Sequence, residues 1–148
     1  MGRNSFMELE GKIWKEGKWW IVEVPCLNVT SQGKTKKDAL CMIKNAVFEL
    51  MKSYFKGLSK NFDITVHDYK GESFGVTSND SNLLLSFLLI RQREESGLSI
   101  RDVAKRLSSK SPNSYAQYER GTMNFSIVQY EKLMHAINPK RTSILRVI

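Results

Sequence analysis

The sequence of 148 residues has few cysteines and prolines and no long hydrophobic run. Its two cysteines, Cys26 and Cys41, are too few for a disulfide scaffold and match no zinc-binding spacing, so we expect reduced, buried thiols. The longest apolar stretch, Leu83–Ile90, spans eight residues with Ser86 inside it, far below the roughly 18 apolar residues of a membrane helix. Residues 1–6 lack the apolar segment of a secretory signal. These absences argue against a membrane, exported or disulfide-stabilised protein and predict a cytoplasmic one.

Positive charge is concentrated in the second part of the chain. Residues 1–80 contain 12 Lys and Arg against 10 Asp and Glu, whereas residues 81–148 contain 11 against 5. The net charge is therefore +2 in the first part and +6 in the second. A basic segment suits a polyanionic partner such as nucleic acid, but a binding motif is needed to make that inference specific.

The first part has the pattern of a small antiparallel sheet with one long helix. Aromatic and β-branched residues predict two strands, 13–15 and 18–24, joined by a tight turn at Gly17. Thr35, with an acidic residue three positions later, is typical of a helix N-terminus and precedes an apolar stripe at helical spacing. Further short strands are predicted at 28–33, 62–67 and 73–77. The sequence therefore predicts a two-layer α+β domain over residues 1–78.

The second part, residues 79–148, has only helical patterns. Capping sequences at Ser99 and Ser126 open two helices, Pro112 opens another, and Gly121 ends it. A further apolar helix begins near Leu83. Several short helices with a tight turn between the second and third are typical of a helix-turn-helix DNA-binding domain.

Four short sequences make this pattern more specific: Ile90-Arg91-Gln92-Arg93, Gly97-Leu98-Ser99, Asp102-Val103-Ala104 and Tyr118-Glu119-Arg120-Gly121. With them, residues 83–138 resemble the Cro/C1-type helix-turn-helix family. The resemblance implies an ion pair between Arg93 and Glu119. It also implies that DNA bases are read by Asn113, Ser114 and Gln117, and that DNA phosphates are contacted by Arg101, Lys110 and Arg120.

Three motifs in the first part follow one another in a characteristic order: Trp20–Leu27 ends in Val-Pro-Cys-Leu, Thr30–Thr35 reads Thr-Ser-Gln-Gly-Lys-Thr, and Asp38-Ala39 opens an apolar helix. This order is similar to that of HicB antitoxins. The resemblance implies a truncated ribonuclease-H-like fold that binds a small RNA-cleaving HicA toxin. It also implies repression of the toxin–antitoxin operon through operator DNA, and a homodimer or tetramer.

Two apolar features suggest protein contacts. Trp19 and Trp20 are adjacent on a predicted strand and must face opposite sides, so we expect one to pack under the helix and the other to contribute to a toxin interface. The C-terminal tail is apolar beyond what a free terminus requires, and we expect it to contribute to dimerisation through Ile144, Leu145, Val147 and Ile148.

No cluster of catalytic side chains stands out. Ribonuclease-H chemistry needs several carboxylates around two metal ions, whereas Glu23, Asp63 and Asp68 are scattered along the predicted strands. We therefore expect no enzyme activity, metal or cofactor. The leading hypothesis is an antitoxin that also represses its operon. The alternative is a helix-turn-helix regulator whose first domain senses a ligand or only oligomerises.

Overall fold

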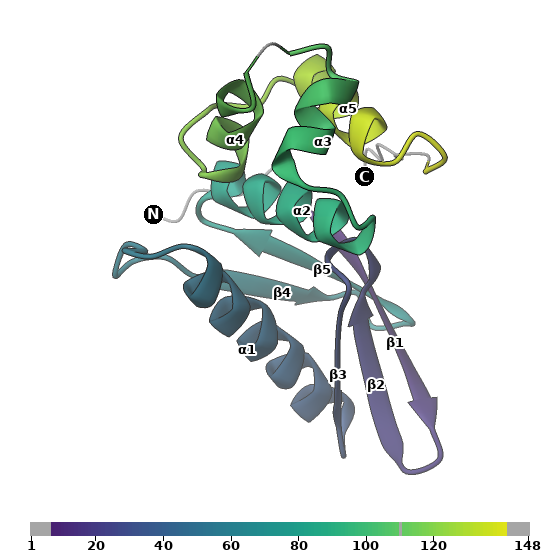
Figure 1. Ribbon diagram of the computed structural model, residues 1–148. Coiled ribbons are helices and arrows are strands. Elements are labelled where there is room, and N and C mark those ends of the chain that lie inside the picture. Colours follow the sequence, from purple (N-terminus) through teal and green to yellow (C-terminus); the bar gives the residue numbers. More distant parts are fainter. Residues whose placement is uncertain (1–6, 110, 142–148) are drawn as a thin grey trace. The chain divides into compact units, whose positions relative to one another are not determined.

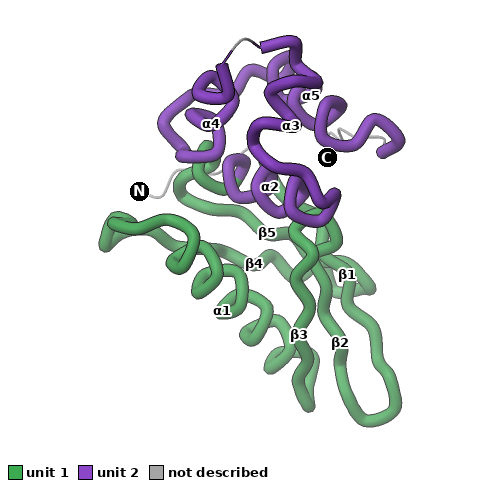
Figure 2. The backbone as a smooth tube through the Cα atoms, in the orientation of Figure 1, with its two compact units in different colours: residues 1–84 green, residues 85–148 purple. Residues whose placement is uncertain are grey.

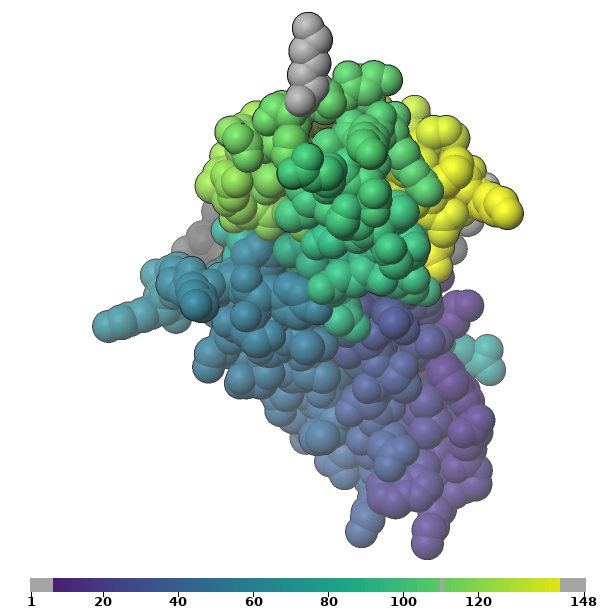
Figure 3. Space-filling model, viewed as in Figure 1, coloured from purple at the N-terminus to yellow at the C-terminus, as the bar shows by residue number. Residues whose placement is uncertain are grey.

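A computed structural model describes residues 7–109 and 111–141 (Figure 1). The chain divides into two compact units, residues 1–84 and 85–148 (Figure 2). The boundary predicted from the sequence lies between residues 78 and 79. Side chains fill the spaces between the ribbon elements of each unit (Figure 3). In the described part of the chain, every helix is too short or too polar to cross a membrane.

Unit 1 is built on a five-stranded sheet in which all neighbouring strands are antiparallel, in the order β3-β2-β1-β5-β4. Its strands are β1 (Leu9–Glu16), β2 (Trp19–Val24), β3 (Val29–Gly33), β4 (Ile64–Asp68) and β5 (Ser73–Ser78). A short 3-10 turn, η1 (Pro25–Leu27), separates β2 from β3. This antiparallel sheet and the helices described below confirm the predicted α+β class.

The hairpin between β1 and β2 has a two-residue loop. Glu16 pairs with Trp19, and Gly17 has a φ of 59°. A positive φ at the first loop position is typical of the type II′ turn, which matches the twist of the flanking strands. The tight turn expected at Gly17 is therefore present.

Helix α1 (Lys36–Tyr54) lies along one face of this sheet (Figure 1). The Thr35 hydroxyl accepts a 3.0 Å hydrogen bond from Asp38 N and so caps the helix. The residues fully buried on α1 recur every fourth position, which places them on one face: Ala39, Ile43, Val47 and Met51. Facing them, Val22 and Val24 of β2 are fully buried, so the core of unit 1 lies between helix and sheet.

Gly33 allows α1 to approach the sheet closely. A Cβ atom added at Gly33 would lie 2.4 Å from the backbone nitrogen of Ala39, closer than real Cβ atoms come. The glycine in the Thr-Ser-Gln-Gly-Lys-Thr sequence is therefore required by packing between β3 and the first turn of α1.

The expectation of two buried thiols is wrong. Cys41 is exposed and Cys26 is half-buried. Cys41 lies two residues from both Ala39 and Ile43, and two residues correspond to about 200° of rotation around a helix. The Cys41 side chain therefore points away from the buried stripe.

Unit 2 is helical. Helix α2 (Ser81–Glu95) crosses the boundary between the units and is followed by α3 (Ile100–Arg106), α4 (Asn113–Glu119) and α5 (Ile127–Ile137). At the start of α3, Ser99 and Asp102 form the complete reciprocal capping box. At the start of α5, the Ser126 hydroxyl accepts a hydrogen bond from Gln129 N.

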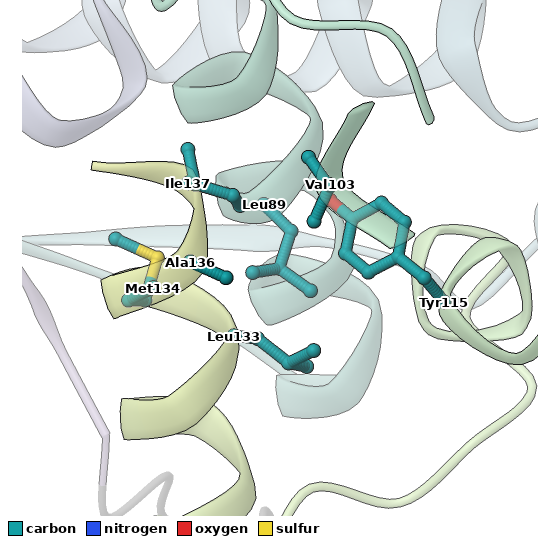
Figure 4. Packing of buried hydrophobic residues seen from close by; sticks show 7 residues of the cluster. All are labelled: Leu89, Val103, Tyr115, Leu133, Met134, Ala136 and Ile137. Carbon is teal, nitrogen blue, oxygen red and sulfur yellow. The ribbon is translucent and has the colours of Figure 1, made fainter. Parts of the chain in front are cut away.

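The core of unit 2 draws on all four helices. Figure 4 shows the seven buried side chains of this cluster: Leu89 from α2, Val103 from α3, Tyr115 from α4, and Leu133, Met134, Ala136 and Ile137 from α5. Because α4 contributes its Tyr115 to this core, the opposite side of α4 is directed outward.

Candidate nucleic-acid interface

The exposed side of α4 carries the three predicted base-reading residues. Asn113, Ser114 and Gln117 are exposed, whereas Tyr115 and Glu119 are buried. Positions 113, 114 and 117 lie on one side of a helix. The structure therefore presents two amides and a hydroxyl together on a surface that the core does not use.

A shallow groove adjoins this surface, between the start of α3 and the first half of α4. It is lined by Arg93, Ser99, Ile100, Arg101, Pro112, Asn113 and Ala116. Arg101 is exposed on the first turn of α3, and Arg120 is exposed immediately after α4. Lys110, the third predicted phosphate contact, lies outside the described residues. The groove thus brings one predicted phosphate contact, Arg101, beside one predicted base reader, Asn113.

Arg93 and Glu119 meet as a bidentate pair. Arg93 Nε donates to Glu119 Oε2 at 2.6 Å, and Arg93 Nη2 donates to Glu119 Oε1 at 3.0 Å. The side chains are only 15% and 7% exposed, and the hydrogen bond to Glu119 raises the pKa of Arg93. Arg93 Nη1 also donates to Leu98 O at 2.9 Å. One guanidinium therefore joins the end of α2, the turn before α3 and the last turn of α4.

Other polar contacts that hold these helices were not predicted. Ser86 Oγ donates to Tyr118 O at 2.5 Å and fixes the end of α4 against α2. Its position inside an apolar run was a usable signal, because a buried hydroxyl needs a partner. Arg106 Nη1 donates to the carbonyl oxygens of Ala136 and Ile137 at 3.0 and 3.2 Å, which satisfies the C-terminal end of α5. Nothing in the local sequence indicated that bond.

The Tyr115 hydroxyl is buried without a hydrogen-bond partner in the described part of the chain. The side chain is 1% exposed, and burial raises the pKa of Tyr115. This residue therefore acts in the core of unit 2 through its ring, and its hydroxyl does not reach the surface beside α4.

Comparison with known families identifies this arrangement. Residues 89–143 match the helix-turn-helix family. The segment is a helix-turn-helix domain of the Cro/C1 type, and it contains α3, α4 and α5. The match indicates a DNA-binding transcription regulator. A search of curated proteins found no match to the chain.

The two tryptophans of the predicted toxin interface lie on opposite faces of the sheet. Trp20 shares the α1 face with Val22, and Lys15 Nζ lies 5.9 Å from the centroid of a Trp20 ring. Trp19 lies on the opposite face, which it shares with Trp14 and Ile21. Both indole side chains are half-buried. The tail residues predicted to dimerise, Ile144, Leu145, Val147 and Ile148, lie outside the described residues.

Proposed function

We propose that this protein is the antitoxin of a HicA/HicB-like type II toxin–antitoxin system: it neutralises an RNA-cleaving toxin by protein binding and represses its own operon. The observation that carries the proposal is the exposed polar side of α4 on a helix-turn-helix domain, in a chain whose first unit contains the HicB-like motifs. The protein itself is proposed to have no enzyme activity.

DNA recognition would divide between two kinds of contact. Asn113 and Gln117 carry amides that can pair with adenine in the major groove, and the Ser114 hydroxyl can pair with several bases. Arg101 and Arg120 would contact phosphates and set the position of the domain without reading sequence. The buried pair of Arg93 with Glu119 would keep α4 in one orientation while it is inserted.

Toxin binding would use unit 1. Its order of three strands, one helix and a returning strand is compatible with a truncated ribonuclease-H-like arrangement, to which β5 adds a strand between β1 and β4. The close approach at Gly33 gives a structural reason for one glycine of the HicB-like motif. The sheet face opposite α1 offers Trp14, Trp19 and Ile21 as apolar contacts for a protein partner.

Co-expression tests the antitoxin part. We expect the small basic protein encoded by the neighbouring reading frame to co-purify with this chain and to lose its RNA-cleaving activity in the complex. Trp19→Ala should weaken the complex, whereas Met42→Ala, at a side chain exposed on α1, should not. A neighbouring product that does not bind this chain and does not cleave RNA would contradict the proposal. That result would favour the ligand-sensing or oligomerising regulator.

Binding to the promoter region of the chain's own gene tests the repressor part. Gln117→Ala should lower affinity for the specific site by roughly 1–3 kcal/mol and leave binding to random DNA almost unchanged. Arg120→Ala should weaken both kinds of binding and reduce the salt slope by about one. Equal losses on specific and random DNA for Gln117→Ala would refute base reading by this residue.

A further inference from the structure

Unit 2 contains an open hollow that shares no lining residue with the groove beside α4. The hollow lies between the turn after α2, the end of α3 and the end of α5. Its volume is about 490 Å³, within the roughly 300–1,000 Å³ of small-molecule sites. We call it the α5 hollow, and its lining includes Leu98, Arg106, His135, Ile137, Pro139 and Lys140.

The polar lining of the α5 hollow is basic. Arg106 and Lys140 carry positive charge, His135 adds an imidazole ring, and none of the described residues that line the hollow is a carboxylate. All three side chains are exposed, and none forms an ion pair within the described part of the chain. Guanidinium and ammonium groups are the usual protein partners of carboxylates and phosphates. The charge of this lining therefore favours an anionic ligand.

The C-terminal end of α5 does not oppose that charge preference. The carbonyl groups at the end of a helix carry partial negative charge, which by itself disfavours an anion. Here Arg106 Nη1 donates to the carbonyl oxygens of Ala136 and Ile137, so two of those groups are already satisfied. Within the described residues, Arg106 makes its hydrogen bonds from Nη1, which leaves the Nε and Nη2 donors for a ligand.

The rest of the lining is apolar. Ile137 is buried, Leu98 is half-buried, and Pro139 adds its ring at the surface. An inorganic ion would leave this apolar surface in contact with water, whereas an organic anion would cover it.

We propose that the α5 hollow binds a small organic anion. Its carboxylate or phosphate group lies among Arg106, His135 and Lys140. Its apolar part lies against Leu98, Ile137 and Pro139. This site goes beyond the proposed function, because neither toxin binding nor base reading by α4 uses these residues. The hollow is open, so its charges are partly screened and the affinity falls as salt is added.

Titration of the full chain, followed by amide chemical shifts in NMR, tests the site. Phenyl phosphate and benzoate present the two anionic groups on the same apolar body, and each should shift the amides of residues 96–98 and 135–138 saturably. The tighter ligand identifies the preferred anionic group. Inorganic phosphate lacks the apolar body and benzyl alcohol lacks the charge, so each should bind at least tenfold more weakly than that ligand.

Two lysines of unit 2 provide a matched pair of variants. Lys140→Ala should raise the dissociation constant of the tighter ligand at least fivefold, because it removes a charge from the lining. Lys132→Ala removes an exposed lysine of α5 outside the hollow and should leave the constant unchanged. Both side chains are exposed, so neither variant should unfold unit 2.

Four results would overturn the proposal. These are the absence of saturable shifts, equal losses in the two lysine variants, inorganic phosphate binding as tightly as phenyl phosphate, and shifts centred on Arg101 and Asn113. Binding that appears only after deletion of residues 142–148 would also overturn it, because the intact chain would then not offer the hollow to a ligand. None of these results bears on toxin binding or on the effect of Gln117→Ala.

Discussion

Removing one member of the buried ion pair should destabilise the helix-turn-helix domain strongly. In Arg93→Leu, the Glu119 carboxylate, which is 7% exposed in the wild-type pair, would lose its guanidinium partner. Breaking a buried pair in this way typically costs about 3–5 kcal/mol, because an uncompensated charge is left in the interior. A typical domain has only about 5–15 kcal/mol of stability. Replacing both members, as in Arg93→Leu with Glu119→Leu, leaves no stranded charge and should recover most of the loss.

Hydrogen exchange measured by mass spectrometry can follow this loss within one unit. A loss of 3–5 kcal/mol corresponds to an increase of about 10²- to 4 × 10³-fold in the opening equilibrium, since each 1.4 kcal/mol is a factor of ten. Peptides from α3, α4 and α5 should exchange faster by this factor in Arg93→Leu. Peptides from α1 in unit 1 serve as the internal reference.

The double variant decides whether the reasoning holds. If Arg93→Leu and the double variant lose the same protection, the cost comes from lost packing of the arginine and not from a stranded Glu119 charge. If Arg93→Leu costs less than about 1 kcal/mol, the pair behaves as an exposed surface ion pair. Either result would refute the assignment of a buried, geometry-fixing pair.

Three further predictions concern local features. Tyr115→Phe should raise the free energy of unfolding by up to about 1 kcal/mol in urea denaturation, because it removes a buried hydroxyl that has no partner in the described structure. Gly33→Ala should lower the free energy of unfolding by about 1–3 kcal/mol, because the added Cβ clashes with α1. Gly71→Ala is the control and should leave the free energy of unfolding unchanged, because a Cβ there meets nothing within 4 Å. The three tryptophans all lie in unit 1, so their fluorescence reports the unfolding of this unit and measures the loss of stability in Gly33→Ala. The hydrogen bond from Ser99 N lowers the pKa of Asp102, so its stabilising contribution is complete above about pH 4 and is lost as the pH falls through the lowered native pKa. Asp102→Asn should therefore flatten the pH dependence of unfolding in that acidic range.

Features that depend on a few neighbouring residues were predictable from the sequence. Gly17 predicted the hairpin turn, and Ser99 with Asp102 predicted the start of α3, because both signals act within four residues. The side of α4 that faces outward agrees with helical spacing, because Tyr115 lies in the core. The residues 113, 114 and 117 were placed on that side by the family resemblance, and spacing alone agrees with it.

Features that depend on distant residues were not predictable in the same way. The strand β5 lies between β1 and β4, an order that no local pattern specifies. Arg106 satisfies carbonyl groups about 30 residues away, and Arg141 donates to the buried Gln92. Which side chains form such hydrogen bonds depends on how the helices pack in three dimensions. The sequence around each residue does not indicate that packing. Cys41 is a different case, because helical spacing from Ala39 and Ile43 already places its side chain off the buried stripe.

Helix α4 is short, and the contacts that fold it are separate from its exposed polar side. A helix of seven residues is not stable by itself, since isolated helices shorter than about 12–15 residues are marginal in water. Its conformation is instead imposed by the Tyr115 ring in the core, by Glu119 on Arg93, and by the bond from Ser86 to the last turn. All of these act from the buried side and at the C-terminal end. The outward side chains Asn113, Ser114 and Gln117 take no part in that core or in that ion pair, so substitutions there can change DNA preference without loosening the domain.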